Sequence, residues 1–127
     1  MGERAMPQTR GQLEAEFSRL MIQFEREHLG RGPEEARTYI FADVIFVRLS
    51  GVLTRAEQHL SRDQEGARLI KEMRLRLMEG SRQTLEGLVS ELTGCQVVSL
   101  HTDLSTRTGE QIIVFILDQH LDQGPRR

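Results

Sequence analysis

The chain has 127 residues, of which 38% are hydrophobic, and this combination is typical of a single globular domain. With 17 Lys and Arg against 19 Asp and Glu, the formal net charge is −2, which excludes a strong global attraction to nucleic acid or to an anionic membrane. The single cysteine, Cys95, excludes an intrachain disulfide, and no apolar run approaches the roughly 20 residues of a membrane-spanning helix. We therefore expect a cytoplasmic protein without direct membrane insertion.

The first predicted element is an amphipathic helix over about residues 11–29. Its apolar residues recur at i, i+4, i+7, i+8 and i+11, so one face carries Leu13, Phe17, Leu20, Met21 and Phe24. Gly30 supplies a C-terminal cap, and Pro33 prevents the helix from continuing. The polar residues 1–10 predict a disordered N-terminus, residues 121–127 predict a flexible tail, and residues 11–120 predict one domain between them.

A hairpin and a short helix are predicted next. Residues 38–49 are rich in β-branched and aromatic residues and are interrupted only by Ala42-Asp43, which predicts a β-hairpin that turns at this dipeptide. Thr54 and Glu57 have the spacing of a capping box, in which each side chain bonds a backbone N–H at the start of a helix. A short helix is therefore expected over about residues 55–61.

A long helix is predicted over about residues 65–93, with Gly80-Ser81 as the place where it can kink. Its periodic apolar positions are Ile70, Met73, Leu77, Leu85, Leu88 and Leu92. Acidic residues alternate with its arginines Arg74, Arg76 and Arg82. This alternation favours a solvated, ion-paired helix face, and RNA binding along the arginines is the alternative.

Two strands complete the predicted fold, over about residues 95–101 and 110–118, with a polar turn at residues 105–109. The apolar run from Ile112 to Leu117 predicts an interior strand that is buried on both faces. The fold class is therefore α+β, a two-layer sandwich in which two hairpins form a four-stranded, largely antiparallel sheet packed with two main helices, in the order αββααββ. Duplication of an αββ unit is an alternative account of this order.

The same sequence patterns predict which partners and cofactors the protein has. The long helix and the doubly apolar strand carry more apolar surface than the first helix can cover, which predicts a homodimer. The 4 histidines lack the i, i+4 spacing of a zinc-binding helix, and Cys95 has no partner histidine nearby in the sequence. We expect no cofactor, no metal, no catalytic residue and no nucleic-acid partner.

Two places in the sequence have residue types that bind or react. His101 and Asp103 alternate along a predicted strand and so share a face, which fits a weak metal or proton-transfer site, although an Asp103 that organises the following turn is favoured. Arg31, Gly32 and Arg37 fit a small-anion site, because glycine lets backbone N–H groups approach an anion and arginines clamp it. A helix cap followed by a rigid turn is the favoured alternative there.

Three segments of the sequence are distinctive together: His28–Pro33, Leu53–Glu57, and Leu92–Gly94 followed by His101–Asp103 and Val114-Phe115. In their order and spacing they resemble the MpsC family of small bacterial proteins. The resemblance covers nearly the whole chain, from the first helix to Leu117. It points to Arg31, Thr54, Arg55, Glu57, His101 and Asp103 as candidate functional residues, which we expect to lie near one another or at a dimer interface.

The family's name implies a component of a sodium-translocating, membrane-potential-generating system, whose membrane subunits are implicated in cation or inorganic-carbon uptake. The resemblance therefore implies a non-enzymatic accessory or regulatory protein whose partners are membrane transport subunits and which is peripheral to the inner face of the membrane through them. Two alternatives stay open at this point. One is a small-anion-binding or hydrolase-type protein that uses His101 and Asp103, and the other is RNA binding.

Overall fold

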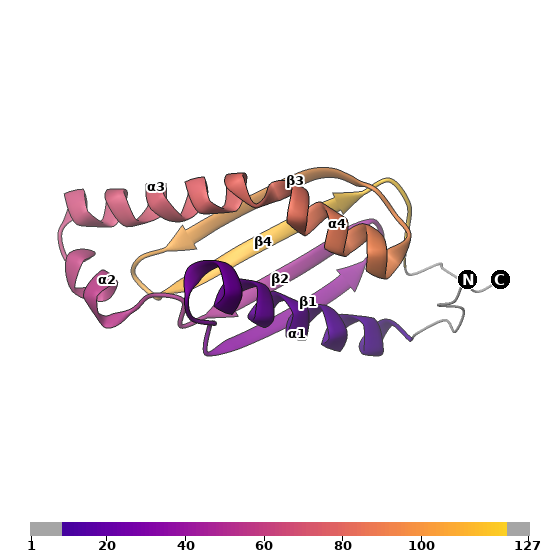
Figure 1. Cartoon of the computed structure of the whole chain (residues 1–127), viewed down its shortest axis with the longest axis horizontal. Helices are drawn as coiled ribbons and strands as arrows, with labels where there is room; N and C mark the ends of the chain where they lie inside the picture. The colour runs from indigo at the N-terminus through magenta and orange to yellow at the C-terminus, as the bar shows by residue number, and fades with distance from the viewer. Residues whose placement is uncertain (1–8, 122–127) are drawn as a thin grey trace.

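The computed structural model describes residues 9–121, in which four helices and a four-stranded antiparallel sheet confirm the predicted α+β class (Figure 1). The predictions for residues 1–8 and 122–127 lie outside the described residues. In chain order the elements are α1 (Arg10–Leu29), β1 (Glu35–Phe41), β2 (Val44–Ser50), α2 (Arg55–Leu60), α3 (Gln64–Gly80), α4 (Arg82–Thr93), β3 (Val97–Ser105) and β4 (Glu110–Leu117).

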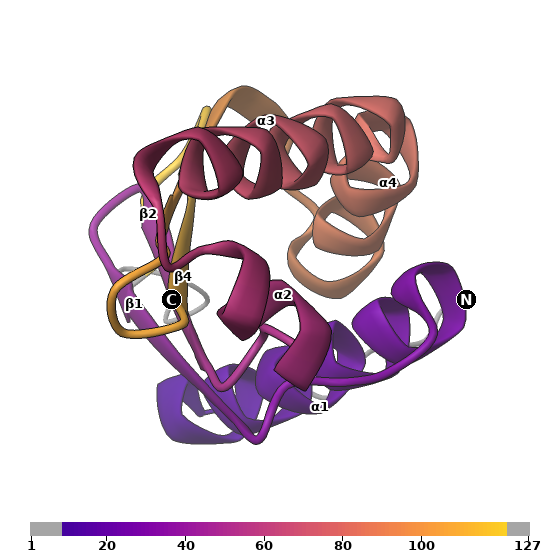
Figure 2. The same ribbon diagram turned by 90° about the vertical axis from the view of Figure 1, so that its left-hand side faces the viewer.

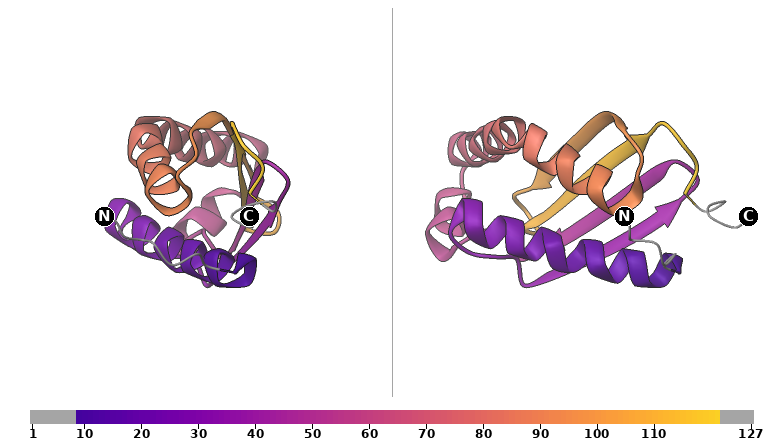
Figure 3. Two further views of the ribbon diagram at one scale, coloured as in Figure 1. Left: turned by 90° about the vertical axis from the view of Figure 1, so that its right-hand side faces the viewer. Right: turned by 45° about the vertical axis from the view of Figure 1, so that its right-hand side comes forward.

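The sheet has the strand order β1-β2-β4-β3, so the two hairpins meet through β2 and β4 in its middle. Seen along the strands, the helices gather on one face of the sheet, with α1 near β1 and with α3 and α4 near β3 (Figures 2 and 3). The core lies between these layers, where alternate residues of each strand pack against the helices. Within residues 9–121, no helix lies over the opposite face of the sheet (Figure 2).

Helix α1 begins one residue earlier than predicted, because Thr9 caps it. The Thr9 hydroxyl accepts a hydrogen bond from the backbone N–H of Gln12 at 3.0 Å, and the Gln12 side chain accepts one from the Thr9 N–H at 3.0 Å. The helix ends at Gly30, whose φ of 89° is in the left-handed region that favours glycine. Its predicted apolar face is buried through Phe17, Met21 and Phe24.

The first hairpin turns at Ala42-Asp43, as predicted, and pairs Phe41 with Val44. Ala42 has a φ of 52°, which a two-residue hairpin turn requires and which a residue other than glycine adopts at some cost. The end of β4 and the chain after it support this turn, since the Leu117 N–H donates to the Asp43 carbonyl and the Leu121 N–H donates to the Ala42 carbonyl, both at 2.8 Å.

The prediction of one continuous helix over residues 65–93 is wrong. The chain breaks at Ser81, within the predicted kink site Gly80-Ser81, into α3 and α4. Ser81 leaves helical geometry at φ −103° and ψ 8°, and its N–H reaches the carbonyls of Leu77 and Met78 at 3.1 Å. Gly80 and Ser81 both weaken a helix, which explains why the interruption falls at this place. The order is thus αββαααββ, and α4 places Leu85 and Val89 in the core as fully buried side chains.

The prediction that β4 is buried on both faces is also wrong for a single copy of the chain. Gln111, Ile113, Phe115 and Leu117 are buried toward the helices, whereas the residues between them stay partly exposed. Strand β3 also differs from its prediction, since it begins at Val97 and runs past His101 to Ser105, so that it includes Asp103. The outward side of this sheet is therefore partly apolar and uncovered.

Gly66 marks the closest approach of α2 to α3. A Cβ atom at this position would overlap the carbonyl oxygen of Leu60, whereas one at Gly87 in α4 would meet nothing within 4 Å. Gly66→Ala is therefore expected to lower the free energy of unfolding by about 1–3 kcal/mol through overpacking. Gly87→Ala, its matched control, is expected to raise it by up to about 1 kcal/mol through helix propensity. Urea denaturation of both variants tests this, and equal effects would contradict the close contact.

Candidate functional site

The uncovered side of the sheet, called the outer sheet face below, carries three of the predicted functional residues, Arg37, His101 and Asp103. Cross-strand pairing arranges it in three rows, which are Arg37-Arg48-Ile112-Asp103, Tyr39-Phe46-Val114-His101 and Phe41-Val44-Ile116-Ser99, each read in the order β1, β2, β4, β3. The two rows that contain aromatic residues are mostly apolar, and the side chains of Tyr39 and Phe41 are exposed. Charge is concentrated in the row of Arg37, Arg48 and Asp103 and at Glu35 and Glu110 next to it, where Arg48 forms an ion pair with Glu110.

His101 and Asp103 share the outer sheet face, as predicted for alternate residues of a strand, but each has its own partner. The His101 Nε2 atom lies 3.1 Å from the Ser99 hydroxyl. Asp103 Oδ1 accepts the Leu104 N–H at 2.9 Å and lies 3.2 Å from the Lys71 ammonium of α3. The Leu104 hydrogen bond and then Lys71 hold the pKa of Asp103 below its usual value.

The turn after β3 is organised by Ser105 and not by Asp103, which corrects the favoured prediction for that residue. The Ser105 hydroxyl accepts the Thr108 N–H at 3.2 Å, whereas Asp103 lies within β3. Asp103 is thus a charged surface residue of an edge strand, anchored at one carboxylate oxygen.

The predicted anion-site residues lie in two separate parts of the fold, Arg31 and Gly32 in the loop after α1 and Arg37 on β1. The Arg31 guanidinium donates to the Val52 carbonyl at 3.4 Å, which fastens the loop after α1 to the loop before α2. A Cβ atom at Gly32 would lie 3.2 Å from the Ile22 side chain, so glycine allows this loop to pack closely on α1. Arg37 lies on the outer sheet face, where its Nε donates to Glu35 at 2.7 Å.

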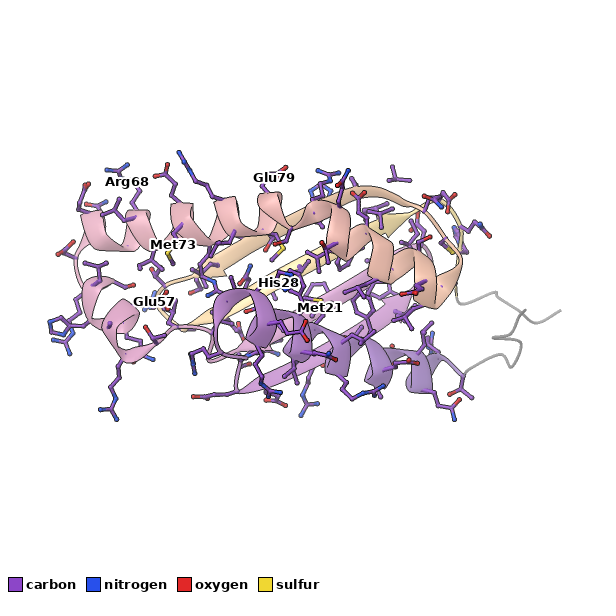
Figure 4. The ribbon with its side chains drawn as sticks, in the orientation of Figure 1. Met21, His28, Glu57, Arg68, Met73 and Glu79 are labelled. Atoms are coloured by element: carbon purple, nitrogen blue, oxygen red, sulfur yellow. The ribbon has the colours of Figure 1, made fainter. Side chains whose placement is uncertain are left out.

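Thr54 and Glu57 form the predicted capping box at the start of α2; Figure 4 labels Glu57 on this helix. The Glu57 carboxylate accepts the Thr54 N–H at 2.8 Å, and the Thr54 hydroxyl accepts the Glu57 N–H at 3.1 Å. Arg55, between them, is exposed. Through the bond from Arg31 to Val52, the structure joins this segment to the glycine-arginine loop, whereas His101 and Asp103 lie apart on the edge strand β3.

A buried polar network that the sequence reading missed connects α1, α3 and the sheet. Arg74 is 6% exposed and Glu25 is 1% exposed, and the Arg74 Nη2 donates to Glu25 Oε1 at 2.9 Å. The Arg74 Nε and Nη2 also donate to the Gln111 side-chain oxygen at 3.2 and 3.1 Å. Gln111 in turn donates to the Thr102 hydroxyl at 3.0 Å. One helix pair and two strands are thereby held in a fixed relation.

Burial raises the pKa of Glu25, and the nearby Arg74 only partly offsets this effect. Among the described residues, Glu25 Oε2 is a buried side-chain oxygen without a hydrogen-bond partner. An acceptor left unpaired in the interior favours the neutral carboxylic acid over the carboxylate. The Glu25 side chain is therefore the place in this network where a change of protonation costs least.

The prediction of a wholly solvated arginine face is correct for two residues and wrong for Arg74. Arg76 pairs with Glu72 at 3.3 Å, and Arg82 pairs with Glu86 at 2.7 Å, both at the surface. Arg74 lies four residues after Ile70 and four before Met78, and all three are buried. That spacing was the available signal, since a charge in register with an apolar face predicts a buried partner.

A second exposed apolar surface runs along α3 and is called the α3 stripe below. It consists of Leu69, Met73 and Leu77, whose side chains are 38–48% exposed, and it corrects the prediction that Met73 and Leu77 belong to the buried face. The stripe lines a shallow hollow of about 450 Å³ together with Glu72 and Arg76. Figure 4 shows Met73 on the side of α3 opposite Arg68 and Glu79.

Comparison with known proteins places these features in a family. The profile of the family described as "Na+-translocating membrane potential-generating system (MpsC)" matches residues 9–119. The chain belongs to the MpsC family. It is 40% identical to the uncharacterized protein YbcI of Bacillus subtilis (strain 168) over 119 residues, which cover 94% of this chain and 96% of YbcI.

A second MpsC-like relative is the uncharacterized protein YrhF of Bacillus subtilis (strain 168), which is 30% identical over 110 residues, 85% of this chain and 89% of YrhF. No solved structure matches the chain. Within residues 9–121, no helix is long and apolar enough to cross a membrane. The same part of the chain holds no cluster of three or more His, Cys, Asp and Glu side chains suited to a metal ion.

Proposed function

We propose that this MpsC-family protein is a non-enzymatic accessory or regulatory protein that binds a membrane subunit of a cation-translocating system. The observation that carries the proposal is the α3 stripe, an exposed apolar surface on a long helix. The binding would hold the chain at the inner face of the membrane through its partner. Cation or inorganic-carbon transport would be the activity of that partner.

The shape of the α3 stripe suits a helical partner. Leu69, Met73 and Leu77 repeat every four residues, which is the spacing by which one helix packs along another. Covering each of these side chains contributes about 1–3 kcal/mol of transfer free energy. Methionine adapts to different partner surfaces, because its side chain is unbranched and polarisable.

The charged residues beside the α3 stripe restrict how a partner can be oriented on it. Glu72 and Arg76 line the same hollow and pair with each other at 3.3 Å. Such a pair at the rim of an apolar patch contributes little affinity but disfavours partners with like charges in the same place. The family description supports a partner from a membrane-potential-generating system.

Affinity capture from membranes in mild detergent tests the proposal. The wild-type chain is expected to recover a cation-transport subunit, identified by mass spectrometry, and Met73→Lys is expected to reduce the recovery at least about tenfold, because it places a charge in the apolar contact. The matched control is Leu75→Lys. Leu75 is 39% exposed on the same helix, but it lies on the side of Lys71, which faces β3. Equal recovery with both variants, or no transport subunit with the wild type, would refute the proposal.

A further inference from the structure

We propose that the outer sheet face is the interface of a symmetric homodimer, in which the sheet of a second copy packs face to face on the first. The inference goes beyond the proposed function, since it concerns a different surface and leaves the α3 stripe of each copy exposed. It rests on two properties of the outer sheet face, its apolar centre and the placement of its charges.

The centre of the outer sheet face is apolar across β1, β2 and β4, and the edge strand β3 adds His101 and Ser99 to the same rows. Tyr39 on β1 pairs with Phe46 on β2, with ring centroids 6.2 Å apart, and Phe46 is opposite Val114 on β4. The next row continues this surface with Phe41, Val44 and Ile116. An antiparallel sheet with one solvated face normally carries polar residues there, so this apolar centre indicates a covering layer.

The charges of the outer sheet face are placed so that a second copy complements them. Arg37 lies on the edge strand β1, and Asp103 lies in the same row on the opposite edge strand β3. Both side chains are exposed, although each has a neighbour within its own chain, Glu35 for Arg37 and Lys71 for Asp103. The Leu104 N–H and the Lys71 ammonium both contact Oδ1 of Asp103, whose side chain is 74% exposed.

A twofold axis that lies between the two sheets, centred between β2 and β4 and inclined by about 15° to the strands, brings these groups together. Because this axis exchanges the two edges of the sheet and preserves the rows, Arg37 of one copy faces Asp103 of the other, and Tyr39 faces His101. Phe46 then faces Val114 in the middle of the interface. Sheets pack about 10 Å apart with strands rotated by about 30°, which displaces the facing edges by about 4 Å, a distance that an arginine side chain spans. An isologous interface needs this kind of self-complementary surface.

The size of the outer sheet face sets the expected strength of the dimer. Four strands about 4.8 Å apart and about seven residues long cover about 440 Å² in projection. Two such faces, with the relief of their side chains, bury about 1,000 Å², which is near the lower limit for a specific interface. We therefore expect dissociation in the micromolar range, which sedimentation equilibrium at about 1–100 μM resolves.

Charge reversal tests the pairing of Arg37 with Asp103 in the full chain. Arg37→Asp and Asp103→Arg are each expected to raise the dimer dissociation constant about 10–100-fold, because twofold symmetry repeats every like-charge contact. The double variant Arg37→Asp/Asp103→Arg restores opposite charges across the interface, and its dissociation constant is expected to return to within about threefold of the wild-type value. Arg68→Asp, which reverses an exposed charge paired with Glu65 on α3, is the control and is expected to leave the dimer unchanged.

The apolar centre is tested separately by Val114→Lys, which places two ammonium groups near the axis and is expected to yield a monomer. Thermal unfolding of each variant shows whether the monomer is folded, and the rescued double variant tests the interface even if a single variant is destabilised. A wild-type chain that stays monomeric over the whole concentration range would overturn the proposal. So would single reversals without effect, a double variant that is not rescued, or a dimer that Leu69→Lys dissociates and Val114→Lys does not.

Discussion

Arg74→Met is expected to lower the free energy of unfolding by about 3–5 kcal/mol, because it leaves the carboxyl of Glu25 buried without its cation. Gln111 also loses the two hydrogen bonds that Arg74 donates to its side-chain oxygen. Methionine has a similar length and fills most of the space, so lost packing is a minor part of the effect. Urea denaturation followed by circular dichroism measures it.

The surface pair of Arg76 and Glu72 supplies the matched control for this experiment. Arg76→Met removes an ion pair on the same helix, but because both partners are solvated, the expected cost is at most about 1 kcal/mol. The double variant Glu25→Leu/Arg74→Met removes both buried charges and is expected to recover most of the stability lost in the single variant. Similar losses for Arg74→Met and Arg76→Met would contradict a buried, closely coupled pair.

Glu25→Gln is expected to change how the stability depends on pH. The pKa of Glu25 is raised in the folded state, so in the pH range from its ordinary value of 4.5 up through the raised value the folded chain binds more protons than the unfolded chain. The wild type therefore loses stability as the pH rises through that range, by about 1.4 kcal/mol for each unit of pKa shift. Glutamine does not titrate, so the variant lacks this loss.

The measured quantity is the difference in unfolding free energy between the wild type and Glu25→Gln, followed from pH 4 to pH 8. It is expected to fall as the pH rises from the ordinary pKa of Glu25 towards its raised value. Asp103, whose pKa is lowered, titrates below this range and is present in both proteins, so its contribution cancels. A difference that rises with pH would mean that Arg74 dominates over burial at Glu25.

The elements that local chemistry dictates were predicted well. Thr54 and Glu57 sit three residues apart, and their capping box starts α2 as expected. Ala42-Asp43 was the only interruption in a β-branched stretch, and the hairpin turns there. Gly30 ends α1 with a positive φ. Each of these features depends on residues within a few positions of one another, which a sequence displays directly.

The features that depend on distant residues were not predicted. Whether Gly80-Ser81 bends a helix or breaks it is decided by how α4 packs on the core. Arg74 was placed among solvated arginines because its partners, Glu25 and Gln111, lie 49 and 37 positions away. Periodicity shows which face a residue occupies, but only the tertiary structure shows what it meets there.

The candidate site residues also divide into features that the local sequence predicts and features that depend on the tertiary structure. Alternation along a strand correctly placed His101 and Asp103 on one face, and the structure adds that this face is the outer sheet face. The family resemblance selected three segments, of which two are joined by the bond from Arg31 to Val52. The relation of Asp103 to Arg37 follows only from the strand order, because the two residues lie on opposite edges of the sheet.

The two exposed apolar surfaces have separate roles in this account. The outer sheet face would join two copies, and the α3 stripe would bind the membrane partner. Since a twofold dimer presents two identical stripes, we expect one partner subunit for each copy of the chain.

The most direct test of the central claim, binding of a membrane partner through α3, is site-specific photo-crosslinking in the native bacterium. A photo-crosslinking amino acid at Met73 is expected to give a covalent adduct with a cation-transport subunit in the membrane fraction. The same group at Leu75, on the other side of the helix and equally accessible, is expected to give none. An adduct of equal yield at both positions, or no membrane-protein adduct at Met73, would contradict the account.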